Sequence, residues 1–90
     1  MNDWVEVKIV NKFGFHVRPS TAFSQLAKQY SSTITVQADS TKVDAKSIMG
    51  LMTLGATCDS MIRIEANGGD AKQALAALKA LVEGSFGGIE

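Results

Sequence analysis

Hydrophobic and polar residues alternate along four short stretches of the chain. The alternation covers residues 4–10, 33–39, 42–45 and 61–66. In the first stretch, Val5, Val7 and Ile9 would share one face of an extended strand. Such alternation is typical of strands with one buried and one solvated face. The turn sequence Asp-Ser-Thr at 39–41 predicts a hairpin between the second and third strands. The pattern therefore predicts one sheet that is covered on a single side.

Three other stretches carry apolar residues at helical spacing. They predict helices over roughly residues 17–30, 47–55 and 71–83. Ser47 is suited to cap the second helix and Gly55 to end it. Asp70 is suited to cap the third, with Gln73 in capping-box spacing, and Gly84 to follow its last turn. The order β-α-β-β-α-β-α indicates a two-layer α+β domain with a mainly antiparallel sheet. The strand order stays open, because a ferredoxin-like order fits these patterns equally well.

The composition narrows the class of protein. The 90 residues are 46% hydrophobic, as expected of a single domain spanning 1–90. Nine basic and nine acidic residues give a net charge of zero, which argues against nucleic-acid binding. The lone Cys58 excludes an internal disulfide and a cysteine-rich zinc site. With no signal-peptide pattern and no long apolar run, we expect a cytoplasmic monomer without metal, cofactor or membrane insertion.

The only histidine, His16, lies where the first strand is expected to give way to the first helix. A lone histidine is more often a surface or capping residue than a catalyst, but this setting favours chemistry. The first amides of a helix have no intrahelical partners and attract an anion. Pro19 suits a first helical turn, where its missing N–H costs nothing. We therefore expect His16 and Arg18 to meet free amides at a phosphate cradle and helix start formed by Val17, Pro19 and Ser20.

A phosphoryl group suits such a place. Neutral imidazole is a nucleophile that needs no assisting base, and the positive end of the helix favours the neutral ring. After transfer, the same amides and the Arg18 guanidinium can hold the anion. The sequence near His16 contains no second carboxylate, metal-ligand cluster or glycine-rich nucleotide loop. These residues predict a phosphoryl carrier rather than a kinase with its own nucleotide site.

Two motifs, NKFGFHVRPSTAF and, later in the chain, VDAKSIMGLMTLG, resemble those of the HPr family, the phosphocarriers of the bacterial sugar phosphotransferase system. The resemblance covers essentially the whole chain. It implies an open-faced β-sandwich, with four antiparallel strands covered on one face by three helices. It also implies that enzyme I phosphorylates His16, with Arg18 beside it, and that IIA domains of sugar permeases receive the group. The protein would then be a carrier and not an enzyme.

The resemblance further implies regulation and a docking surface. In many HPr proteins an HPr kinase/phosphorylase modifies the serine of the KSIMG motif, which is Ser47 here. Taken alone, Ser47 reads as a helix N-cap, and both roles are compatible because a helix N-terminus tolerates a phosphate. The expected docking residues for these partners are Thr21, Phe23, Ile48, Met49 and Met52.

A few positions depart from the family's usual pattern. Phe15 and Val17 replace the common Leu and Ala beside the histidine, and Ser20 often reads Ala. Asp59 stands where a turn glycine is common, although Asp adopts left-handed conformations more readily than most residues. These departures leave the branch of the family open between a sugar-type carrier, a nitrogen-regulation paralogue and a fructose-specific form. The intact KSIMG motif favours the sugar type.

Two other classes of protein deserve comparison. A small acyl-phosphate hydrolase also combines an α+β fold with an anion cradle and an arginine. It needs a positioned water molecule, and Asn11 is the nearest residue that could hold one. An RNA-binding sheet is disfavoured by the absence of net positive charge and of aromatic stacking positions on the solvated strand faces. Continuous turnover of an acyl phosphate would separate a hydrolase from a carrier.

Overall fold

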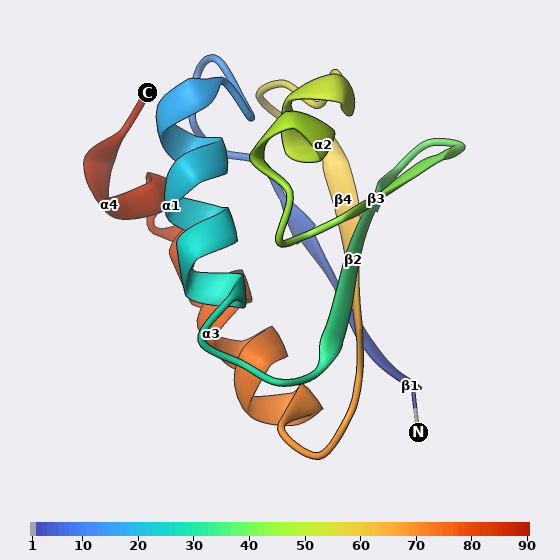
Figure 1. The fold of residues 1–90 in the computed structure, drawn as a ribbon. Helices are drawn as coiled ribbons and strands as arrows, with labels where there is room; N and C mark the ends of the chain where they lie inside the picture. Colours follow the sequence, from blue (N-terminus) through green and yellow to red (C-terminus); the bar gives the residue numbers. More distant parts are fainter. Residues whose placement is uncertain (1) are drawn as a thin grey trace.

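The structure, a computed structural model, describes residues 2–90. Its elements in chain order are β1 (Asn2–Lys8), α1 (Val17–Ala27), β2 (Thr33–Ala38), β3 (Thr41–Asp44), α2 (Ile48–Thr53), β4 (Met61–Asn67), α3 (Ala71–Glu83) and α4 (Ser85–Gly88). The strands form one antiparallel sheet in the order β1-β4-β2-β3, and the helices lie to one side of it (Figure 1). The predicted open-faced α+β sandwich is confirmed. The ferredoxin-like order, in which the first strand is internal, is excluded because β1 lies at the sheet edge.

Alternation along the strands produces a sheet with one apolar face. The register aligns Val5 of β1 and Val36 of β2 with Ile64 of the central strand β4. Side chains from the inner face of the sheet pack against α1 and α3. The fully buried core residues include Ile34, Val36, Ile62 and Ile64 from the strands, and Phe23, Leu78 and Val82 from the helices. Because neighbouring strand residues point to opposite faces, the other face remains in contact with solvent. The core therefore lies between the sheet and the helices.

Most element boundaries differ from those predicted by one to three residues, and at the ends of β1 and α1 turn hydrogen bonds take over. β1 ends at Lys8 rather than at residue 10. The next N–H, that of Ile9, donates to Ser60 O at 2.8 Å in the turn that precedes β4. α1 ends at Ala27 rather than at residue 30. The Tyr30 N–H bonds the carbonyl three residues earlier, at 3.2 Å. The apolar spacing thus continues past the α-helix into a tighter turn.

One predicted helix cap is present and the other is not. Ser47 caps α2, because its Oγ accepts the Gly50 N–H at 3.0 Å. The capping box predicted at Asp70 is wrong, since its carboxylate makes no bond to α3. That carboxylate instead accepts the N–H groups of Ser31 and Ser32, at 2.8 and 3.0 Å, and the Ser32 hydroxyl. These hydrogen bonds hold the pKa of Asp70 at about 2, below its ordinary 3.8.

The chain after α3 forms an element that the sequence analysis does not predict. Gly84 ends α3 as expected, but its φ of −87° is not left-handed. The left-handed residues follow it, and α4 is a single turn in which all four residues have positive φ. Phe86 is buried in this turn. The expectation of three helices therefore omits a short left-handed turn at the end of the described chain.

Candidate functional site

The loop between β1 and α1 is held from within by Asn11 and Gly14. Asn11 is buried, and its Nδ2 donates to Gly14 O at 2.8 Å. Gly14 has a φ of +60°, and a Cβ atom there would lie 1.9 Å from Ala56 O, so only glycine fits. The Phe15 N–H donates to the same Ala56 oxygen at 3.4 Å. The loop is thus docked on the α2–β4 connection and carries His16 in a defined place.

His16 is the N-cap residue of α1, but its side chain is not used for capping. Its backbone N–H donates to Gly14 O and its carbonyl accepts the Ser20 N–H, both at 3.0 Å. The ring Nε2 is buried and has no partner within residues 2–90, whereas Nδ1, which also forms no hydrogen bond there, is open to solvent. The Phe13 ring meets the imidazole edge-on, with centroids 6.2 Å apart. Nδ1 is therefore the ring nitrogen that an incoming group can reach.

The first turn of α1 leaves hydrogen-bond donors free beside this ring. The N–H groups of Val17 and Arg18 have no acceptor in the described chain, and Pro19 has no N–H to leave unpaired. Arg18 is exposed and forms no ion pair among residues 2–90. No acidic residue lies in the first turn. An anion bound to His16 would meet two free N–H groups, the positive end of a helix and an unpaired guanidinium.

The structure removes Ser20 from the predicted phosphate cradle. Ser20 is completely buried; its N–H is bonded to His16, and its hydroxyl donates to Phe15 O at 3.1 Å. Pro19 is also buried. Both residues lie at the start of the helix, as predicted, but neither offers a hydrogen-bond donor to a ligand. The N–H groups that remain free are those of Val17 and Arg18.

Ser47 lies at the start of α2, which packs beside α1 (Figure 1). The two helices are joined where Ser24 Oγ, on α1, donates to Lys46 O at 2.9 Å. The Ser47 oxygen accepts the cap bond, while its hydroxyl hydrogen has no acceptor in the described chain. A Cβ atom at Gly50 would lie 3.2 Å from that oxygen. The absence of a side chain at Gly50 therefore keeps the Ser47 hydroxyl clear.

The predicted docking residues divide into exposed and buried ones. Those that keep exposed surface are Thr21, Ile48, Met49 and Met52. Met49 is the most exposed of them, at 78%. The prediction for Phe23 is wrong, because this side chain is 0% exposed and packs against Phe15 with ring centroids 5.3 Å apart. A side chain without surface cannot contact a partner.

Phe13 is an exposed residue near His16 that the sequence analysis does not single out. Its side chain is 57% exposed, and Lys12 Nζ lies 5.3 Å from its ring centroid. Val17, expected in the cradle, is equally exposed. Both place apolar surface around the histidine. The only signal for Phe13 in the sequence is its place within the first motif.

The structure also bears on the other classes of protein. The Asn11 side chain is buried and its Nδ2 donates to Gly14 O inside the loop, so it does not face the solvent from which a hydrolytic water molecule would come. The expectation of no aromatic residue on the solvated sheet face is wrong, because Trp4 is half exposed there with the Arg63 guanidinium 4.1 Å from its ring centroid.

Within residues 2–90, no three His, Cys, Asp or Glu side chains form a metal-binding group, and no helix is long and apolar enough to cross a membrane. Cys58 is exposed.

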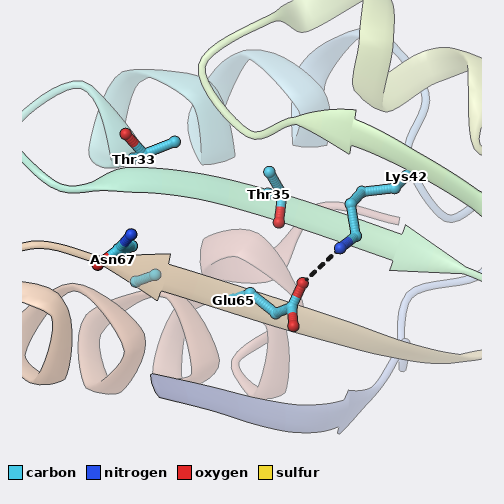
Figure 2. A pocket seen from close by; sticks show the side chains of 6 residues that line it. Thr33, Thr35, Lys42, Glu65 and Asn67 are labelled. Atoms are coloured by element: carbon cyan, nitrogen blue, oxygen red, sulfur yellow. Dashed lines mark ion pairs between the residues drawn. The ribbon is translucent and has the colours of Figure 1, made fainter. Parts of the chain in front are cut away.

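A hollow of about 200 Å³ lies on the solvated face of the sheet. It is lined by Thr33, Thr35, Lys42, Glu65, Ala66 and Asn67 (Figure 2). Lys42 Nζ lies 2.7 Å from Glu65 Oε1, and this ion pair lowers the pKa of Glu65. None of the predicted site residues lines the hollow. It is therefore separate from the histidine at the start of α1.

Fold and site together define a small open-faced α+β domain that presents an unpaired histidine at a helix N-terminus. The family model "PTS HPr component phosphorylation site" matches residues 5–84. The phosphocarrier protein HPr of Neisseria meningitidis serogroup A is 42% identical over 81 residues, which cover 90% of this chain and 91% of that protein.

Solved structures of similar proteins agree with this match. The crystal structure of HPr-C-His from Thermoanaerobacter tengcongensis shares 44% identity at a TM-score of 0.90, covering 94% of this chain and 96% of that one. The phosphocarrier protein HPr of Bacillus anthracis shares 40% identity at a TM-score of 0.86, covering 90% and 96%. The chain belongs to the HPr family, the phosphocarriers of the phosphotransferase system.

Proposed function

We propose that this protein accepts a phosphoryl group on His16 from phosphorylated enzyme I and passes it to IIA domains of sugar permeases. The observation that carries the proposal is the open Nδ1 of His16 at the N-cap of α1. Beside it lie the unpaired N–H groups of Val17 and Arg18 and a guanidinium without an ion-pair partner in residues 2–90. Membership of the HPr family supports the same role.

The transfer is a displacement at phosphorus. The Nδ1 lone pair forms a bond to phosphorus while the bond between phosphorus and the donor breaks, and the donor keeps that electron pair. The ring proton stays on the buried Nε2 of His16 throughout. Negative charge on the outer phosphoryl oxygens is stabilised by the free N–H groups and by Arg18. Delivery to the IIA domain is the same displacement in reverse, with a nucleophile of the IIA domain as the new acceptor.

This site is built to hold a phosphoryl group and not to hydrolyse it. No other histidine is present in the chain, and the amide nitrogen of Asn11 is engaged within the loop. Neither a second histidine nor Asn11 is therefore available to activate water beside the phosphohistidine. The protein acts as a carrier whose turnover depends on its partners, rather than as an enzyme with a substrate of its own.

Partners dock, in this proposal, on the exposed residues of α1 and α2 near the histidine. Met49 and Met52 give α2 an adaptable apolar surface, which suits several partners because methionine side chains rearrange easily. Ile48 and Thr21 contribute the remaining partly exposed surface. Ser47 is the N-cap residue of this short helix, and we propose it as the target of an HPr kinase/phosphorylase. A phosphate there would add about −1.5 to −2 charges beside the docking surface.

The direct test incubates the protein with enzyme I and phosphoenolpyruvate. We expect one acid-labile phosphate in the wild type and none in His16→Ala, with ³¹P and ¹⁵N NMR placing the phosphorus on Nδ1. Cys58→Ala is the matched control, because it removes an exposed nucleophile elsewhere in the chain, and it should be labelled like the wild type. Labelling that persists in His16→Ala would overturn the proposal.

Two further measurements test the alternatives. Continuous release of phosphate from an acyl phosphate, without enzyme I, would favour the hydrolase. Phosphorylation by the enzyme I of a nitrogen-regulation system, but not by the sugar-type enzyme I, would place the protein in the nitrogen-regulation branch. We expect neither, because the KSIMG motif is intact and the Asn11 side chain is buried within the loop.

A further inference from the structure

The backbone is strained immediately after α3. Ser85, Phe86, Gly87 and Gly88 follow one another with φ of 55°, 56°, 82° and 96°. Residues other than glycine avoid this left-handed region, because Cβ comes too close to the following carbonyl oxygen. Two of the four are not glycine. Such a run persists only where surrounding contacts hold it, and strain of this kind often marks a functional constraint.

The contacts that hold this turn are internal hydrogen bonds and one buried ring. The Ile89 N–H donates to Ser85 O at 2.8 Å, and Ser85 Oγ donates to Ile89 O at 2.7 Å. Phe86 is buried, with its ring centroid 5.5 Å from that of Phe15. These contacts therefore anchor the turn in the core next to the β1–α1 loop.

Residues 84–90, which we call the C-terminal strap, contact that loop on both sides of Gly14. On one side the Phe13 N–H donates to the main-chain oxygen of Glu90 at 2.9 Å. On the other side Phe86 packs against Phe15. Phe13 also meets the His16 ring edge-on. Figure 1 shows α4 and the end of the chain beside α1, which agrees with their packing.

We propose that the C-terminal strap is a positioning element for His16, and this inference rests on the proposed function of that residue. The strap holds Phe13 and Phe15, the residues that flank Gly14, so that the loop presents Nδ1 at the free N–H groups of α1. The strained turn is what directs Glu90 to the Phe13 N–H. Releasing the strap should leave the core and the docking helix intact while the ring loses its defined place.

The variant Gly88→Val tests this without a steric clash. A Cβ atom at Gly88 meets no atom within 4 Å, but a φ of +96° is strongly unfavourable for a branched residue. Gly69→Val is the matched control. Its Cβ also meets nothing within 4 Å, its φ is not in the left-handed region, and it lies in the β4–α3 connection, away from α4 (Figure 1).

In Gly88→Val we expect the Phe13 amide to exchange with solvent about tenfold faster. Transfer from enzyme I at saturating concentration should fall by about tenfold, because small misplacements of a reacting group are costly. The KM for enzyme I should stay unchanged, since α2 is untouched. Gly69→Val should match the wild type in all three quantities. If Gly88→Val does not fold, Ser85→Ala replaces it, because it removes the Oγ bond to Ile89. It should also speed exchange of the Phe13 amide and slow transfer from enzyme I.

Two results would overturn the proposal. Unchanged Phe13 exchange would mean that the left-handed turn does not hold the loop. Faster exchange with an unchanged saturating transfer rate would make the strap a structural element only. Failure of the proposed function is distinguishable from both, because the wild type itself would then take no phosphate on His16 from enzyme I.

Discussion

Replacing Ser47 separates two roles that share one hydroxyl group. Ser47→Ala removes the acceptor of the Gly50 N–H, at 3.0 Å, and should lower the free energy of unfolding by about 1 kcal/mol. In a domain of this size that loss lowers Tm by about 4–8 °C. Ser47→Asp supplies another good N-cap acceptor. Its Tm should therefore stay close to that of the wild type.

In phosphotransfer the order is reversed: Ser47→Asp should change the kinetics, and Ser47→Ala should not. Ser47→Asp places a negative charge beside the exposed Met49 and Met52. A partner that meets the unpaired Arg18 should itself carry acidic groups, so the new charge faces like charge. A cost of about 1.4 kcal/mol corresponds to tenfold in affinity. We expect the KM for enzyme I to rise by about tenfold in Ser47→Asp, and to stay at its wild-type value in Ser47→Ala.

The assay combines thermal unfolding by circular dichroism with enzyme I kinetics at varied carrier concentration. Ser40→Asp is the matched control, because it adds the same charge at an exposed position in the β2–β3 turn. It should leave the kinetics unchanged. A folded Ser47→Asp protein with wild-type kinetics would refute the regulatory reasoning and leave Ser47 as a cap. Equal slowing by Ser40→Asp would refute the argument for a local effect on docking.

Three further predictions concern other parts of the molecule. His16→Ala should lose all phosphoryl acceptance while its unfolding free energy stays within about 0.5 kcal/mol of the wild type; a large drop in stability would contradict the loop geometry. Arg18→Gln should lower the saturating transfer rate more than it raises the KM, because its charge is proposed to act on the moving phosphoryl group; an unchanged saturating rate would remove that role. The lowered pKa of Asp70, about 2 against 3.8, means that its bonds to Ser31 and Ser32 stabilise the fold above about pH 4 and are lost as the pH falls toward 2. Asp70→Asn should therefore flatten the fall of Tm over that acid range, and an unaltered slope would show that these bonds contribute nothing.

The strands and the one-sided sheet could be predicted because burial on alternate residues is a local property. Val5, Val36 and Ile64 each reveal their inward face through their own neighbours in the sequence. The strand order could not be predicted in the same way. Pairing of β1 with β4, and of β4 with β2, joins segments that are far apart in the chain, and nothing within one strand encodes its partner.

The wrong predictions for Phe23 and Asp70 have different physical causes. Phe23 shares a helical face with the buried Ala27, so its own spacing predicts burial, and the resemblance to a family placed it on the surface instead. Asp70 stands where a cap belongs, but donors from Ser31 and Ser32 compete for the same carboxylate. Those donors come from the α1–β2 connection, so no local pattern could reveal them.

The place of the candidate site could be predicted, whereas its geometry depends on distant parts of the chain. His16 and Pro19 mark a helix start by local rules, which is why the sequence locates the free N–H groups. The loop that carries His16 is instead positioned by Ala56 and by the C-terminal strap. Burial of Nε2 leaves Nδ1 open, and this difference between two nitrogens of one ring arises only from the folded surroundings. The choice between the two nitrogens as the proposed accepting atom is therefore a tertiary property, although the sequence alone predicts the residue.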